Sequence, residues 1–316
     1  MNRRRFIGSV GGGLVVASFD VVAQHMAKMF RIGVIDPFSR SDPVNLLILR
    51  ILGDLGYVEG KSIDIEWRSV EPALASELAR LKLDAIMAIG DLAIQAARQA
   101  TSTTPIIAGT DDLAGEGHVT NLARPEGNVT GVSILSSELN AKRLQLLNAA
   151  VPTAVRVAVL WDPATGTFHL PALHAEAARL GVALNVLEVR RPGDLGGALE
   201  SARAWHAEAL NILASPFLHT LRKQIFKHAA RNRLPAIYQW ADAAREGGLM
   251  GYGPTYAEIF RQMCAQLDRI LKGAKPADLP VEQPTKFELG INLISAKALG
   301  IKIPQSLLLR ADQVIQ

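Results

Sequence analysis

Short apolar strand patterns alternate with amphipathic helix patterns along this chain, and the whole series occurs twice. The first series has strand patterns at 30–36, 63–67, 85–89 and 105–108, and helix patterns at 44–55 and 92–100. The second has helix patterns at 136–149, 170–180, 195–204 and 221–232, and strand patterns at 155–160, 183–189, 209–214 and 236–238. Such alternation is typical of an α/β fold with mostly parallel sheets. We therefore predict two Rossmann-like lobes with parallel sheets.

The C-terminal part of the chain is predicted to connect and complete these lobes. A glycine-flanked segment at 249–254 crosses between them, a long helix follows at 256–271, and a strand near 287–291 precedes a helix at 295–299. Lobe 1 would then comprise 30–135 with part of 252–280, and lobe 2 would comprise 136–250 with part of 281–316. Several crossings make a multi-strand hinge, in which Gly251 and Gly253 are plausible pivots. Ligands of open α/β sheets bind beyond the carboxyl ends of the strands, so we expect a site between the lobes.

The first 23 residues have the layout of a bacterial export signal. Arg3 to Arg5 precede a short uncharged segment, and Val21 to Ala23 supply a small-residue cleavage pattern. The apolar stretch is shorter than the roughly 20 residues that a spanning helix needs. Arg3 and Arg4 favour the twin-arginine route, while Asn2 leaves the ordinary secretory route open. We predict a periplasmic protein; the alternative is a disordered basic N-terminus on a cytoplasmic one.

Composition excludes several classes of partner. The formal charge of the 316 residues is +4, and loss of three signal arginines and Asp20 lowers it to +2. No basic stretch is interleaved with aromatic residues, so no nucleic-acid partner is expected. Cys264 is the single cysteine, which excludes an internal disulfide and a multi-cysteine metal site. The histidines, His118 and His219 among them, are scattered without acidic or thiol partners. We expect a monomer with no cofactor and no metal.

Five segments resemble the bacterial transporter substrate-binding proteins that include binders of tryptophan and other aromatic amino acids. The matching segments, in chain order, are 55–60, 122–131, 247–254, 270–280 and 284–289. The resemblance covers essentially the whole chain after the signal. It implies the two-lobe fold of a type I periplasmic binding protein, which captures a small solute and delivers it to an ABC permease in the inner membrane. It leaves the identity of the solute open.

In lobe 1, the loops that follow the predicted strands supply the candidate ligand contacts. These candidates are Asp36, Ser39, Asp91, Thr110 and Asp112. Asp91 either caps the helix at 92–100 or contacts the ligand. Asp112 stands where the resembling proteins carry an Asp-Pro pair, and its carboxylate could hold a substrate amine. Leu113 replaces that proline, and Asp111 adds a second carboxylate, which makes the ligand of this loop uncertain.

In lobe 2, the corresponding candidates are Asp162, Thr165, Ser215, Trp240 and Tyr252. Thr165 precedes a helix whose first backbone N–H groups suit an anion. Ser215 replaces an aspartate common in the resembling proteins, which removes a negative charge. Trp240 either forms a flat wall or packs at a sheet edge, whereas Tyr252 is predicted to be a wall of the site.

Three other functions remain to be weighed against solute capture. An enzyme on this fold would need a nucleophile and base, and no serine lies in a nucleophile-elbow sequence. A sugar-regulator type would carry a DNA-binding head where this chain has its signal. A receptor that feeds a signalling protein cannot be separated from transport by sequence. Our first expectation for the solute is a carboxylate-bearing aromatic or branched molecule.

Overall fold

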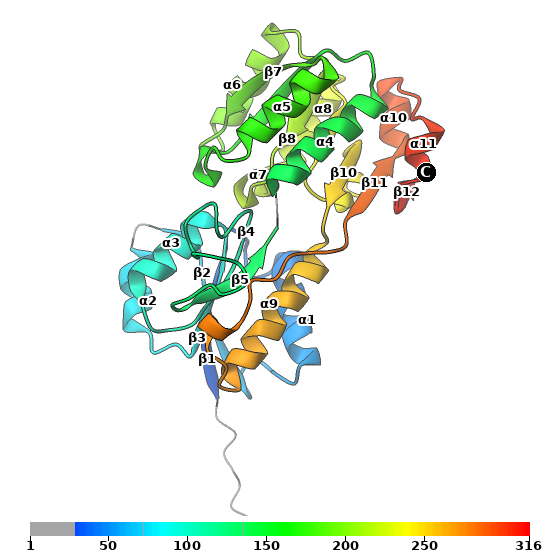
Figure 1. The fold of residues 1–316 in the computed structure, drawn as a ribbon. Helices are drawn as coiled ribbons and strands as arrows, with labels where there is room; N and C mark the ends of the chain where they lie inside the picture. Colours follow the sequence, from blue (N-terminus) through cyan, green and yellow to red (C-terminus); the bar gives the residue numbers. More distant parts are fainter. Residues whose placement is uncertain (1–28, 72, 135) are drawn as a thin grey trace, which may run out of the picture.

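The computed structural model describes residues 29–71, 73–134 and 136–316. Figure 1 shows two lobes, one above the other, joined by a few extended segments. The predicted export signal at 1–23 lies outside the described residues. Within the described part of the chain, no helix is both long and apolar enough to cross a membrane.

Lobe 1 is built on a five-stranded parallel sheet with the strand order β2-β1-β3-β4-β5. Its strands are β1 (Phe30–Ile35), β2 (Ile63–Arg68), β3 (Ala85–Ile89), β4 (Ile106–Thr110) and β5 (Val129–Ser133). Its helices are α1 (Pro43–Asp54), α2 (Leu74–Arg80) and α3 (Asp91–Ala100). The inner strands are buried on both faces, which explains their continuous apolar runs.

Lobe 2 is built on a seven-stranded sheet with the strand order β12-β11-β10-β9-β8-β6-β7. Its strands are β6 (Arg156–Trp161), β7 (Ala183–Glu188), β8 (Ala209–Ile212), β9 (Ala236–Tyr238), β10 (Met250–Gly253), β11 (Glu288–Asn292) and β12 (Gln313–Ile315). Its helices are α4 (Ser136–Ala150), α5 (Leu170–Leu180), α6 (Asp194–Ala204), α7 (Pro216–Thr220), α8 (Arg222–Arg231), α10 (Leu293–Leu299) and α11 (Gln305–Leu308). Only the β10–β11 pair is antiparallel among the described pairings of this sheet.

Helix α9 (Tyr256–Leu271) returns to lobe 1, where Figure 1 shows it beside α1. Its buried face, which includes Met263, Cys264 and Leu267, joins the lobe 1 core. The chain crosses between the lobes after β5, after β10 and before β11. Two α/β lobes with parallel-dominated sheets confirm the predicted fold class.

The prediction that Gly251 and Gly253 are hinge pivots is wrong. Both lie in β10, which is paired on both edges inside the lobe 2 sheet. A Cβ atom on Gly251 would lie 1.9 Å from the Trp240 carbonyl oxygen, and one on Gly253 would lie 2.2 Å from that of Gln239. These glycines therefore permit close packing of the backbone, and the crossing itself follows at Pro254 and Thr255.

Six short elements have no counterpart among the predicted strands and helices: α2, α7, α11, β5, β10 and β12. The three helices among them have at most seven residues, which is too short for a clear helical period. Helix α7 begins where the Ser215 hydroxyl accepts a hydrogen bond from the Leu218 N–H, with Pro216 as the first helical residue. This cap places the Ser215 side chain at the end of β8, facing lobe 1.

Candidate ligand-binding site

Loops from both lobes enclose a cavity between the sheets, which we call the inner cavity. From lobe 1 it is lined by the loops after β1, β3, β4 and β5, and from lobe 2 by those after β6, β8 and β9. The start of α9 closes one side. The lining residues with polar side chains are Asp91, Thr110, Asp111, Thr165, Ser215, Gln239, Trp240 and Tyr256. This position at the carboxyl ends of the strands is where ligands of α/β sheets bind.

Asp36, directly after β1, shapes the loop that carries Phe38 into the inner cavity. One carboxylate oxygen of Asp36 accepts hydrogen bonds from the Phe38 N–H at 2.7 Å and from the Asn45 amide at 3.3 Å. Burial raises the pKa of Asp36 to about 6, although these two hydrogen bonds oppose the shift. Asp36 therefore does not line the inner cavity itself; it positions Phe38, which does.

The polar wall of lobe 1 is acidic. Asp91 and Asp111 line the inner cavity, and Glu116 lies directly behind Thr110, whose hydroxyl donates to it at 3.0 Å. Burial, together with the charges of Asp111 and Asp91, raises the pKa of Glu116 to about 9. His118 Nε2 lies 2.6 Å from an Asp91 oxygen. Several carboxyl groups thus gather behind one face of the cavity.

The polar wall of lobe 2 is a linked hydrogen-bond network. The Ser215 hydroxyl donates to Asp162 at 2.7 Å, and the Gln239 amide bonds the backbone of Ser215 in both directions at 3.1 Å. Thr165 donates its hydroxyl proton to the Asp162 carbonyl at 2.8 Å. Burial raises the pKa of Asp162, and the hydrogen bond from Ser215 opposes that shift. The network fixes the ends of β6, β8 and β9 relative to one another.

Four aromatic rings meet where the lobes approach each other. Trp240 and Tyr256 have ring centroids 4.4 Å apart, and His219 packs edge-on against Tyr256 at 5.3 Å. Phe38 of lobe 1 contacts His219 of lobe 2 at 5.8 Å. These rings leave the inner cavity a volume of only about 40 Å³. A solute must therefore part them, and motion about the three crossings can supply the space.

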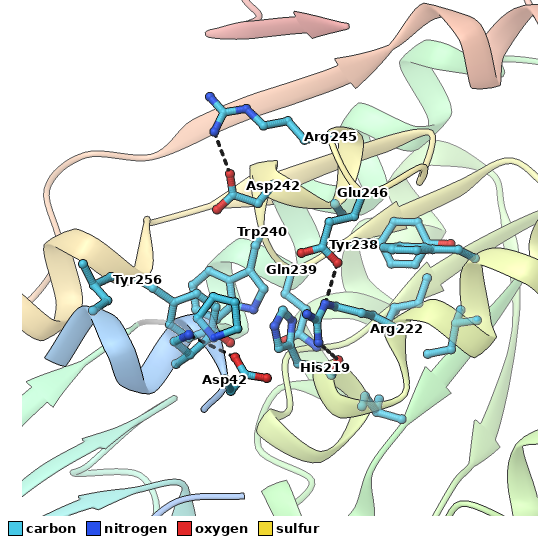
Figure 2. Close-up of a pocket in the computed structure, with 18 residues that line it drawn as sticks. Asp42, His219, Arg222, Tyr238, Gln239, Trp240, Asp242, Arg245, Glu246 and Tyr256 are labelled. Carbon is cyan, nitrogen blue, oxygen red and sulfur yellow. Dashed lines mark hydrogen bonds and ion pairs between the residues drawn. The ribbon is translucent and has the colours of Figure 1, made fainter. Parts of the chain in front are cut away.

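A larger chamber, which we call the outer chamber, adjoins the inner cavity and shares the residues Gln239, Trp240 and Tyr256 with it. Its volume is about 300 Å³, the lower end of the range for ligand sites. Figure 2 shows Asp42 of lobe 1 facing Arg222 and Glu246 of lobe 2 across this chamber. Arg222 donates to Glu246 at 2.7 Å and to the His219 carbonyl at 3.1 Å. The chamber combines aromatic walls with a charged rim.

Two buried groups of lobe 2 lie at or behind the wall of the inner cavity. The indole N–H of Trp240 has no hydrogen-bond partner although the residue is 8% exposed and lines both cavities. Arg143 of α4 donates to the Tyr252 and Gln239 carbonyls and to Asn140, and burial lowers its pKa to about 10. The charge of Asp111 opposes this shift, so the guanidinium and the carboxylate of the opposite lobe sense each other. Lobe 2 thus has an unpartnered donor in the cavity wall and a positive charge buried behind it.

The structure brings five of the ten predicted contacts to the inner cavity: Asp91, Thr110, Thr165, Ser215 and Trp240. Asp162 supports Ser215 from behind. Asp112 accepts a hydrogen bond from the Gly115 N–H and closes a turn, while Asp111 takes the cavity position. Ser39 is exposed in the loop before α1.

The prediction that Tyr252 is a wall of the site is not supported by its position. Its ring lies 6.2 Å from that of Phe287, against the lobe 2 core, and it lines neither cavity. The reason is strand register: in β10 its neighbours Gly251 and Gly253 face the loop after β9, so the Tyr252 side chain points to the other face.

Sequence reasoning missed Phe38, His219, Gln239 and Tyr256. Tyr256 is the first residue of α9 after a crossing, a position that signals proximity to both lobes. The expectation that His118 has no acidic partner is also wrong, because folding places it beside Asp91 and Glu116. His219 is buried among aromatic rings, and burial lowers its pKa to about 3.

Loops from both sheets thus surround a cavity between the two lobes. This arrangement is typical of two-lobed solute-binding proteins. A family model described as ABC transporter substrate binding protein matches residues 48–315. The chain belongs to this family, as its five matching segments predict.

Individual relatives agree with this assignment. A protein named "Tyrosine-binding protein" from Clostridioides difficile (strain R20291) is 25% identical over 264 residues, which is 80% of this chain and 75% of the relative. A conserved domain protein from Vibrio cholerae has a TM-score of 0.83 at 25% identity, covering 91% of this chain and all of that one. A domain from Streptococcus pneumonia in complex with L-Trp has a TM-score of 0.81 at 24% identity, with the same coverages.

Proposed function

We propose that this protein captures an amino acid with an aromatic or branched side chain between its lobes and delivers it to an ABC permease. The observation that carries the proposal is the polarity of the cleft. Carboxylates line it from lobe 1, whereas an unpartnered indole N–H and a buried guanidinium lie on the side of lobe 2. A solute with an ammonium group and a carboxylate group complements both walls through charge-assisted hydrogen bonds.

The aromatic rings supply the remaining part of the site. Phe38, Trp240 and Tyr256 surround the inner cavity and can pack on the faces of an aromatic side chain or on a branched aliphatic one. The names of the two relatives, one for tyrosine and one crystallised with L-Trp, support an aromatic solute. Delivery to a permease from the periplasm is supported by the family and by the predicted signal.

The test is a thermal-shift and calorimetric screen of the protein, refolded to remove carried ligand. Tyrosine, tryptophan, phenylalanine and leucine are compared with benzoate, sugars and dipeptides. A solute at 100 times its dissociation constant adds about 2.7 kcal/mol to the free energy of unfolding, which shifts the melting temperature by several degrees. If no amino acid produces a shift and benzoate does, the ligand is an acid without an amine, and the role of the acidic wall is refuted.

A further inference from the structure

Three metal-binding side chains of lobe 1 converge beside the inner cavity. Asp91 is the first residue of α3, and Glu116 and His118 lie on the loop that follows β4. One ligand atom from each lies within 4.8 Å of the others, with His118 Nε2 2.6 Å from an Asp91 oxygen and 3.5 Å from Glu116 Oε2. Ligand atoms about 2.1 Å from a shared metal lie about 3 Å apart when adjacent, so these atoms are spaced for one ion.

The surroundings of Glu116 independently indicate a cation site at this point. Its side chain is only 5% exposed, and its Oε2 atom has no hydrogen-bond partner. The other oxygen, Oε1, is held by the Thr110 hydroxyl at 3.0 Å, which turns Oε2 towards His118. A buried carboxylate oxygen without a donor costs free energy, and a cation would satisfy it.

Among the described residues, no Arg or Lys side chain forms an ion pair with Asp91 or Glu116. Arg98 is close, but its guanidinium contacts the His118 ring at Nδ1, 3.3 Å away, and the Gly117 carbonyl at 3.0 Å. Asp91 also accepts a hydrogen bond from Gln95 at 2.7 Å, which leaves its second oxygen for His118. Carboxyl oxygens of Asp91 and Glu116 therefore face the same point as Nε2 of His118.

We propose that Asp91, Glu116 and His118 bind a divalent first-row transition metal, for which Zn²⁺ and Mn²⁺ are the probes. One imidazole and two carboxylates suit such an ion better than Mg²⁺ or Ca²⁺, which prefer oxygen ligands alone. Three protein ligands leave at least one coordination position open. Because Asp91 and Thr110 also line the inner cavity, that position lies next to the cleft.

Metal binding would change the role of Arg98. When Nε2 of His118 binds a metal, its Nδ1 carries the proton and can no longer accept a hydrogen bond from Arg98. Arg98 would then keep only its bond to the Gly117 carbonyl. Removal of the Arg98 guanidinium should therefore strengthen metal binding. If the three side chains formed only a structural hydrogen-bond network, the same change would lower the stability of the protein and would not raise its affinity for a metal.

The experiment titrates the EDTA-treated and dialysed protein, without any solute, with ZnCl₂, MnCl₂ and MgCl₂ in a calorimeter. We expect one equivalent of Zn²⁺ or Mn²⁺ to bind and to raise the melting temperature, and Mg²⁺ to bind at least tenfold more weakly. Glu116→Gln and His118→Gln should each weaken binding at least about tenfold, and Arg98→Gln should strengthen it. Asp112→Asn, on the same loop and outside the cluster, is the matched control and should bind as the unaltered protein does.

Two results would overturn the proposal. One is the absence of Zn²⁺ and Mn²⁺ binding by the folded, unaltered protein; the other is undiminished binding by Glu116→Gln, which would place the ion elsewhere. Glu116→Gln keeps an acceptor for Thr110 and the size of the side chain, so it should fold. Because no solute is present, failure of this proposal leaves the solute-binding proposal untouched.

Discussion

The two walls of the cleft treat charge in opposite ways. Lobe 1 gathers carboxyl groups whose pKa values are raised by burial, among them Asp36 and Glu116. Lobe 2 holds basic groups whose pKa values are lowered by burial, among them Arg143, His169 and His219. In both walls, burial disfavours the charged form of these groups. A solute with both charges could therefore favour the charged forms in both walls: its ammonium group would favour ionised carboxyl groups in lobe 1, and its carboxylate would favour protonated bases in lobe 2.

Arg143 should give the largest effect, because it anchors the lobe 2 wall. Arg143→Met removes donors from the Tyr252 and Gln239 carbonyls and leaves them unsatisfied in the interior. We expect the free energy of unfolding to fall by about 3 kcal/mol in urea denaturation. The neighbouring Lys142→Met is the control and should cost far less, since Lys142 donates to the Gln145 side chain and not to backbone carbonyls of the core. Equal stability of the two variants would remove Arg143 as the anchor.

Substitution of single polar groups tests the roles proposed for the two walls. Asp111→Asn should weaken binding of an aromatic amino acid by about 2 kcal/mol, roughly thirtyfold, because a charge-assisted hydrogen bond to the ammonium group is lost. The same variant should bind the deaminated acid, such as 3-phenylpropionate, as before.

Trp240→Phe keeps a ring and removes the indole N–H. It should weaken binding of the amino acid and of the deaminated acid by about 1 kcal/mol, and leave the corresponding amine unaffected. Calorimetry with the three analogues measures each contribution. If Asp111→Asn weakens the acid and Trp240→Phe weakens the amine, the orientation proposed for the solute is reversed.

His219 of lobe 2 and Asp36 of lobe 1 should make the stability of the protein depend on pH with opposite signs. Folded His219 takes up a proton only near pH 3, because burial lowers its pKa, whereas the unfolded residue does so near 6.5. Acid therefore favours the unfolded state over this window, and lowering the pH from 7 to 5.5 should cost about 1 kcal/mol through this residue. His219→Phe should remove that dependence.

Asp36 should behave in the opposite way. Burial raises its pKa to about 6, above the unfolded value near 3.9, so the folded state holds an extra proton between these values. Stability should decline by about 1 to 2 kcal/mol as the pH rises from 4 to 5.5, and Asp36→Asn should remove this decline. Denaturation midpoints measured across pH 4 to 7 give both slopes; parallel slopes for the two variants would refute the contrast.

Tyr252→Ala should have the smallest effect on binding. The ring packs on Phe287 and the lobe 2 core and does not line either cavity, so affinity for any solute found in the screen should change less than about twofold. Stability should fall by about 1 to 3 kcal/mol because a large ring is lost from packing. A tenfold loss of affinity would return Tyr252 to the site.

Periodicity predicted the long elements well. The strand at 85–89 and the helices at 170–180 and 256–271 have the predicted bounds, because each carries an uninterrupted apolar pattern. Five residues that line the inner cavity were among the predicted contacts, since the carboxyl ends of parallel strands are recognisable in sequence. Short elements such as α7 escaped because their caps give only a local signal.

The α/β class, the two repeated lobes and the family can be predicted from local properties of the chain, namely strand and helix periods and long motifs. Which side chains meet in the cleft depends on the tertiary structure. In the folded protein Asp111 lines the inner cavity and Asp112 does not. Tyr256 and His219 lie together at the cleft, and His118 lies beside Asp91 and Glu116. These outcomes depend on strand register and on loops that approach from distant parts of the chain, and no local pattern encodes either.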